Sequence, residues 1–297
     1  MCDPSLDCRT RSARHNFSTI QTLCTLLSLA LAVFGTLPSN ASAITILRNF
    51  VGGGAFPIAG GSGTAAPGNA VGGGNLATII DAAADYWEAA LLDPHVFTIN
   101  FGWQALPAGN LGVATQFNIP QPGFGGDIKF DSDGSSVFFL DPTPWENSEY
   151  NTQTLSSVNL GGGSINVGRV YSNANINEAL NIDLFTVAQH EIGHLLGIAD
   201  IFSFTTPTLT TTAPRPNAGT VIPTTLIGGG HINILPSLMF PSFSSGVRRL
   251  QSEVDILAAA EANGFVNINL SPDIVPEPST ALLLSLGLLG LTAKRRR

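Results

Sequence analysis

The chain has 297 residues, of which 44% are hydrophobic and only 11% are charged, enough to build the core of one large domain or two small ones. Its 32 glycines and 19 prolines predict many turns and loops rather than a long helical bundle. The 21 acidic and 13 basic residues give a formal net charge of −8. This acidity argues against a nucleic-acid partner, because such binding depends on neutralising phosphates with Lys and Arg.

All three cysteines lie within the first 24 residues, at Cys2, Cys8 and Cys24. The remainder of the chain therefore has no disulfide framework and no cysteine that could bind a metal. A metal site there must be built from His, Asp or Glu.

The N-terminus has the order of a secretory signal peptide. Three arginines precede an apolar run from Leu23 to Leu37, and the small-x-small sequence Ala41-Ser42-Ala43 follows. A buried core helix would explain the apolar run but not the basic flank or the cleavage site. We therefore predict that residues 1–43 are a signal peptide, removed by signal peptidase during export.

The C-terminus, residues 274–297, has three parts in a fixed order. Val-Pro-Glu-Pro-Ser at 275–279 precedes an apolar stretch, Ala281 to Ala293, and four basic residues end the chain. As a helix the stretch spans about 20 Å, short of the roughly 30 Å of a bilayer core. This tail resembles the PEP-CTERM sorting signal of Gram-negative bacteria. The resemblance implies membrane contact, processing by an exosortase, and release to the cell envelope or extracellular matrix; a simple membrane anchor is the alternative.

The body begins with a strand-like segment, Ile44 to Phe50, followed by a glycine-rich run that predicts a linker or wide loop up to residue 74. Apolar residues at helical spacing then predict a helix over Asn75 to Leu92, which Asp93-Pro94 ends. Alternation over Val96 to Trp103 predicts a strand. Further strands are predicted at 111–119, 127–130, 137–140 and 164–170.

A second helix is predicted over Ile182 to Gly197, with Asp183 or Asn181 as its N-cap. Residues 204–225 lack helix and strand periodicity and are predicted as a long loop. A last helix is predicted over Gln251 to Asn263, ended by Gly264. The order of these elements predicts an α+β domain over residues 75–270.

The chemically informative segment, 189–200, reads QHEIGHLLGIAD. His190 and His194 are four residues apart, so on a helix both imidazoles leave one face and can share a metal ion. Glu191 follows the first histidine, where its carboxylate can reach a metal-activated water. Two structural histidines are the alternative, and this interpretation suits the isolated His95. The spacing around Glu191 favours a zinc site instead.

Zinc requires at least one more protein ligand. Gly197 can adopt a left-handed conformation and turn the chain sharply after the helix, which would bring Asp200 round to the metal. His231, in a Gly-Gly-Gly-His sequence, is the alternative third ligand. The spacing favours Asp200.

The extended pattern His-Glu-x-x-His-x-x-Gly-x-x-Asp resembles that of the metzincins, most of which have His at the last position. Ser237 to Pro241, with the sequence SLMFP, resembles the metzincin Met-turn, in which a methionine, here Met239, forms an apolar floor beneath the zinc. The resemblance implies a zincin/metzincin-like fold. Such a fold has a twisted mixed sheet, two long helices above an active-site cleft, and a small C-terminal subdomain with one helix.

The same resemblance implies a secreted zinc-dependent endopeptidase that acts on proteins or peptides, with Glu191 as the general base. Two alternatives are a non-catalytic zinc-binding adhesion protein of the matrix or cell surface, and a zinc hydrolase for non-peptide substrates. The presence of Glu191 argues against the adhesion protein, because a purely structural zinc site needs no base.

Aspartates near Asp131-Ser132-Asp133-Gly134, together with Asp127 and Asp141, could bind structural calcium. The spacing of a complete calcium loop is missing, and Asp-Gly is an ordinary turn signal. A simple turn is therefore the alternative.

Overall fold

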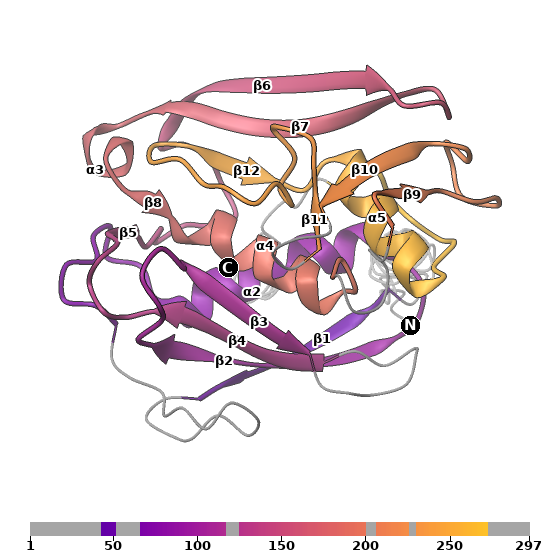
Figure 1. The fold of residues 1–297 in the computed structure, drawn as a ribbon. Helices are drawn as coiled ribbons and strands as arrows, with labels where there is room; N and C mark the ends of the chain where they lie inside the picture. Colours follow the sequence, from indigo (N-terminus) through magenta and orange to yellow (C-terminus); the bar gives the residue numbers. More distant parts are fainter. Residues whose placement is uncertain (1–42, 52–65, 117–124, 200–205, 226–229, 273–297) are drawn as a thin grey trace, which may run out of the picture. The chain divides into compact units, whose positions relative to one another are not determined.

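The computed structural model describes residues 43–51, 66–116, 125–199, 206–225 and 230–272 (Figure 1). All but the last residue of the predicted signal peptide, together with the sorting tail and Asp200, lie outside these ranges. Among the helices that the structure describes, none is long and apolar enough to cross a membrane.

A four-stranded mixed sheet carries one side of the core, with strand order β1-β2-β4-β3 (Figure 1). β1 (Thr45–Phe50), β2 (Val96–Gln104) and β4 (Gly125–Asp131) run parallel, and β3 (Gly112–Gln116) pairs antiparallel with β4 at the edge. Alternation along β2 turns every second side chain into the core. These buried residues are Phe97, Ile99, Phe101 and Trp103.

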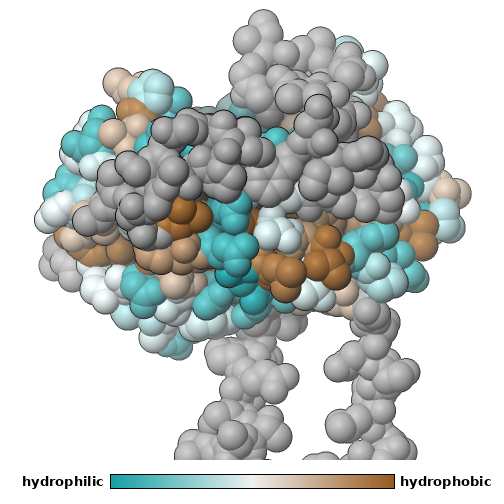
Figure 2. Space-filling view, turned by 90° about the horizontal axis from the view of Figure 1, so that it is seen from below, coloured by the Kyte–Doolittle hydropathy of each residue, from teal (hydrophilic) through white to brown (hydrophobic). Residues whose placement is uncertain are grey.

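The opposite face of this sheet carries a row of hydrogen-bonded polar side chains. The Asn49 amide donates to Asn100 Oδ1 (3.2 Å), and the Asn100 amide donates to Asp127 Oδ1 (2.9 Å), across three neighbouring strands. Seen from below, hydrophilic residues form a band between hydrophobic patches (Figure 2). The mixed pattern follows from alternation, since residues that do not face the helices need not be apolar.

Two helices, α2 (Leu76–Ala90) and α4 (Leu184–Leu195), pack against each other and against this sheet (Figure 1). Both predicted helices are confirmed. The N-cap of α2 is Asn75, whose side chain accepts from the Thr78 N–H. At the start of α4, the side chain of Asp183, one of the two predicted caps, accepts a hydrogen bond from the Thr186 N–H at 3.1 Å.

A second, three-stranded antiparallel sheet is formed by β6 (Tyr150–Asn159), β7 (Ser164–Ala174) and β12 (Arg248–Leu250). β12 contacts α4, so this helix touches both sheets. The sequence predicts β7 but misses β6, because almost every residue of β6 is polar and exposed and gives no apolar alternation.

The prediction that residues 204–225 form a long loop is wrong in part. β9 (Thr208–Thr210) pairs antiparallel with β10 (Val221–Thr225), which also pairs with β11 (His231–Ile232). In β9 and β10, Ile222 is the one hydrophobic residue that is fully buried in the core. Such a short contribution leaves no period to detect in the sequence.

Three short elements complete the domain together with the last helix. β5 (Phe138–Phe139) pairs in parallel with β8 (Ile182–Asp183), and α3 (Ile176–Ala179) follows β7. The predicted last helix is confirmed as α5 (Glu253–Asn263), which ends at Gly264 in a left-handed conformation with φ 73°. The α+β class and the mixed sheet with two packed helices agree with the predicted fold.

The N-terminal strand is integral to the domain. Ile44 and Ile46 are each 2% exposed in the core. The Ile46 N–H donates to Glu88 Oε1 at 2.6 Å, and Arg48 pairs with Asp85 at 2.7 Å, so β1 is bound to α2 as well as to β2. Thr45–Phe50 therefore completes the sheet rather than preceding it as a separate segment.

Replacing Ile46 tests this role of β1. We expect Ile46→Ala to lower the free energy of unfolding by about 3 kcal/mol, because it opens a cavity in the core. Leu47, its neighbour on the strand, is 49% exposed, and Leu47→Ala should change stability by no more than ~0.5 kcal/mol. Urea unfolding curves measure both; equal effects would contradict the assignment of β1 to the core.

Candidate metal centre

Three histidine side chains converge beside α4. His190 and His194 are one turn apart on the helix, and their Nε2 atoms are 3.1 Å apart. His231 joins them from β11, with its ring centroid 5.2 Å from that of His190 and 4.8 Å from that of His194. One ring nitrogen of each lies within 4.8 Å of the others. Within the described ranges, no other cluster of His, Asp or Glu meets this criterion for metal binding.

Backbone carbonyls fix the orientation of two of these rings. His190 Nδ1 lies 2.9 Å from the Leu238 carbonyl oxygen, and His194 Nδ1 lies 2.7 Å from that of Ile198. Because a carbonyl can only accept a hydrogen bond, each Nδ1 carries the proton and donates. Both Nε2 lone pairs are then directed toward one point, which is the tautomer that a metal ligand requires.

The buried surroundings keep these imidazoles neutral. Burial lowers the pKa of His190 well below its usual value, and the neighbouring His194 and His231 lower it further. Burial also lowers the pKa of His194 to about 4. Neutral imidazole is the metal-binding form, and a cation between the two facing lone pairs would relieve their repulsion. The donor set therefore fits zinc.

The chain after α4 turns as predicted at Gly197, which has φ 88°. The Gly197 N–H donates to the His194 carbonyl, and the Ile198 N–H donates to that of Gly193. Asp200, the ligand that the spacing favours, lies outside the described residues. The structure brings the alternative ligand, His231, to the other two histidines.

Strand pairing holds His231 in this position. His231 lies opposite Thr225 of β10, and its N–H donates to Thr225 Oγ1 at 3.1 Å. The next residue, Ile232, donates its N–H to the Met239 carbonyl at 3.0 Å. His231 is therefore attached both to β10 and to the turn that contains Met239.

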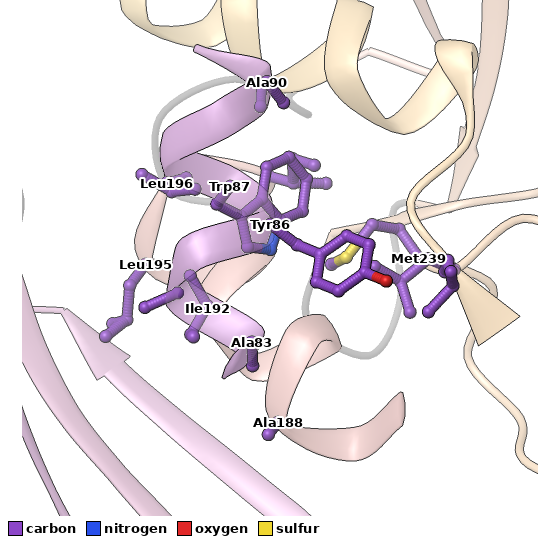
Figure 3. Packing of buried hydrophobic residues seen from close by; sticks show 14 of the residues in the cluster. Ala83, Tyr86, Trp87, Ala90, Ala188, Ile192, Leu195, Leu196 and Met239 are labelled. Atoms are coloured by element: carbon purple, nitrogen blue, oxygen red, sulfur yellow. The ribbon is translucent and has the colours of Figure 1, made fainter. Parts of the chain in front are cut away.

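Met239 lies fully buried beside the histidine helix, as the Met-turn resemblance implies. A Cβ atom at Gly193 would come within 2.4 Å of the Met239 sulfur, so this close approach requires a glycine on α4. Figure 3 shows the Met239 side chain among buried residues of both helices, including Trp87 of α2 and Ile192 of α4. The turn thus packs directly beneath the histidine pair.

The carboxylate of Asp255, in the first turn of α5, holds this turn in place. It accepts from the N–H groups of Leu238 (3.2 Å) and Met239 (3.0 Å) and from both donors of Ser252. The role of Asp255 was not predicted from the sequence, although an acidic residue three positions after a serine, at a helix start, was an available signal. Because the Leu238 carbonyl accepts a hydrogen bond from His190, Asp255 indirectly fixes the position of this metal-binding residue.

Glu191 lies between α4 and the edge strand β3. It is 5% exposed, and a Cβ atom at Gly112 of β3 would come within 2.8 Å of its Cγ and Oε1 atoms. Burial raises the pKa of Glu191 to about 8, although the backbone N–H of Ala114 partly opposes this rise. A cation held by the histidines would favour the ionised carboxylate.

The predicted calcium ligands are engaged in other contacts. Asp131 Oδ1 accepts from the backbone N–H groups of Leu106 (3.0 Å) and Asp133 (3.2 Å), which describes an ordinary turn. Asp141 pairs with the buried Arg248 at 2.5 Å. The structure therefore does not support calcium at these aspartates. His95, predicted to be structural, stacks on Phe265 with the ring centroids 5.0 Å apart.

Comparison with protein families agrees with this geometry. Residues 105–205, which include β3, β4 and α4, match the family model of the matrixins, a metzincin family of peptidases. Residues 275–297 match the PEP-CTERM protein-sorting motif. Over residues 105–205 the chain is similar to the matrixins. A search of the curated proteins finds no significant match.

The matrixin match supports a zinc metallopeptidase, and the three converging histidines provide a suitable donor set. The sorting motif indicates export to the cell envelope or extracellular space of a Gram-negative bacterium, with processing by an exosortase. The matched matrixin span ends before His231 and Met239, so the last part of the centre rests on the structure.

The raised pKa of Glu191 predicts how the stability of the metal-free protein depends on pH. Its folded-state pKa of about 8 exceeds the usual 4.5, so the folded state holds an extra proton between these values. The stability contributed by this proton is therefore lost as pH rises from about 4.5 to about 8. With a chelator present, the free energy of unfolding of Glu191→Gln should rise relative to that of the unmodified protein as pH increases from about 4.5 to about 8. The rise should be at most about 1.4 kcal/mol per pH unit.

Chemical denaturation at several pH values measures this difference. The depressed pKa values of the histidines act in the opposite direction, adding stability as pH rises towards 6.5, but they are common to both proteins. A difference that is equal at pH 5 and pH 8 would contradict the buried, protonated state of Glu191.

Proposed function

We propose that this protein is an exported zinc endopeptidase in which His190, His194 and His231 hold the metal and Glu191 is the general base. The observation that carries the proposal is the convergence of three imidazoles, two of them on the same helix as the buried Glu191. The matrixin match supports the reaction class, and the sorting motif supports export.

The choice of His231 as third ligand rests on its contacts. Its ring lies within 5.2 Å, centroid to centroid, of both helix histidines. Its backbone N–H is bound to Thr225 of β10, and that of the next residue, Ile232, to the Met239 carbonyl. A ligand fixed on both sides loses little entropy when it binds a metal. Asp200 stays the alternative, as either the third ligand or an additional one.

The protein's own groups then perform the proton transfers. Zinc supplies Lewis acidity, which makes a water more acidic and polarises a peptide carbonyl. Glu191, adjacent to the first ligand, accepts the proton of the attacking water and delivers it to the leaving amine. Because Glu191 is buried between α4 and β3, little bulk water competes for that proton.

The edge strand β3 supports a peptide as the substrate. Among the residues that the structure describes, β3 pairs only with β4, at one end of the sheet, and its residues are partly exposed. A free strand edge binds an extended peptide through backbone hydrogen bonds. Since Gly112 of β3 touches Glu191, a peptide along this edge would lie beside the base.

A non-catalytic adhesion protein is the second candidate function, supported by the sorting motif alone. A structural zinc site normally has four closed protein ligands and no need of a base. The buried Glu191 beside three histidines favours catalysis instead.

Peptide-library hydrolysis by the secreted protein, combined with zinc titration, tests the proposal. The unmodified protein should cut peptides, lose activity in chelator and regain it with zinc. Glu191→Ala should still bind zinc but lose roughly 10³-fold in kcat/KM. His231→Ala should weaken zinc binding at least ~100-fold, whereas Asp200→Ala should have a small effect.

The outcomes separate the alternatives. If Asp200→Ala rather than His231→Ala releases the zinc, the third ligand is Asp200. If the unmodified protein binds zinc but cuts no peptide, the adhesion protein becomes the better assignment. A folded protein that binds no zinc would contradict both.

A further inference from the structure

We infer that β3 positions the general base, and that Gly112 is a positioning residue whose missing side chain forms the slot occupied by Glu191. This inference rests on the proposed role of Glu191. It adds a residue outside the His-Glu-x-x-His helix to the requirements for activity. β3 lies alongside α4 in Figure 1, and the two elements are in contact.

The space at Gly112 is taken by the Glu191 side chain. An added Cβ atom would lie 2.8 Å from Glu191 Cγ, 2.8 Å from Oε1 and 3.0 Å from Cδ. Real Cβ atoms essentially never approach other atoms more closely than 3.0 Å, so something would have to move. The backbone of Gly112 does not have a positive φ, unlike many other glycines of the chain. Space, rather than backbone conformation, is therefore the reason for a glycine here.

Two further contacts join the same strand to the metal-binding helix. The Ala114 N–H forms a hydrogen bond with the Glu191 side chain, and the Gln116 side-chain amide donates to the His194 carbonyl at 2.6 Å. Residues 112, 114 and 116 alternate along β3, so they lie on one side of the strand. These three residues thus provide the slot, a backbone donor to the carboxylate and a side-chain bond to the helix.

β3 is itself held at a fixed distance from α4. At Gly126 of β4, a Cβ atom would come within 2.3 Å of the Thr115 carbonyl and 2.5 Å of Leu195 Cδ2. This close packing, together with the hydrogen bond from Gln116 to the His194 carbonyl, holds the sheet against the helix. If a methyl group enters at residue 112, the flexible side chain of Glu191 is the group that gives way.

A displaced Glu191 would lose its bond to Ala114 and its alignment with the attacking water, while the three histidines would keep their positions. Small displacements of a reacting group cost up to about 10²-fold in rate. The change should therefore reduce kcat and leave zinc binding intact.

The experiment compares Gly112→Ala with Gly68→Ala in the full, exported protein. Gly68 is a matched control, because its added Cβ would meet nothing within 4 Å and its φ is not positive. We expect Gly112→Ala to lower kcat roughly 10- to 100-fold, with stoichiometric zinc retained, and Gly68→Ala to behave like the unmodified protein.

A double-mutant comparison of Tm values tests, without an activity assay, whether the Glu191 side chain occupies the space at Gly112. Gly112→Ala should lower the Tm of the zinc-loaded protein by a few degrees, but in the Glu191→Ala background it should cause little or no loss, because the slot is then empty. A purely structural glycine would show the same loss in both backgrounds.

An unchanged kcat, or an equal Tm loss in the two backgrounds, would overturn the inference. If no variant cuts any peptide, the proposed function fails, while the Tm comparison still decides whether Glu191 fills the slot at Gly112.

Discussion

The hydrogen bond from His190 Nδ1 to the Leu238 carbonyl joins the metal-binding helix to the turn beneath it, and the geometry of the centre depends on this bond. It selects the tautomer with the Nε2 lone pair facing His194. The carbonyl is available in this position because Asp255 binds the N–H groups of Leu238 and Met239. The same turn pairs with β11 and so fixes His231. Residues from α4, α5 and β11 are thereby organised around one peptide segment.

The N-terminus of α4 is held just as firmly as its histidines. Asp183 caps the helix and also pairs with Arg248 of β12 at 2.9 Å, while Arg248 bonds Asp141 as well. Arg248 is fully buried, a state tolerated only because two carboxylates neutralise it. The helix that carries His190, Glu191 and His194 is therefore restrained at both ends, which favours a preorganised site.

The parts of this centre that depend on local spacing could be predicted from the sequence. His190, Glu191 and His194 lie within about one turn of a helix, so their spacing predicted the site. The type of side chain at Asp183 predicted the N-cap. The left-handed turn at Gly197 was predicted because this glycine follows the last apolar residues at helical spacing. Alternation predicted individual strands such as β2, whereas the mixed sheet was implied by the metzincin resemblance. His231, in contrast, reaches the centre through the pairing of β9, β10 and β11, whose few apolar residues leave no readable pattern. The support from Asp255 and Gly112 is also long-range, since each acts on residues distant in sequence.

The same limit explains the aspartates near Asp131. Their composition resembles a calcium loop, but composition does not reveal that Asp131 serves a turn and that Asp141 serves Arg248. A carboxylate already satisfied by backbone N–H groups or an arginine has little left to offer a cation. Only the tertiary partners distinguish the two cases.

X-ray absorption spectroscopy at the zinc edge, on the zinc-loaded secreted protein, tests the central claim most directly. We predict a first shell that contains three imidazole nitrogens at about 2.0–2.1 Å. A shell with two imidazoles and a carboxylate oxygen would contradict the assignment of His231, and a folded protein that retains no zinc would contradict the metal centre itself.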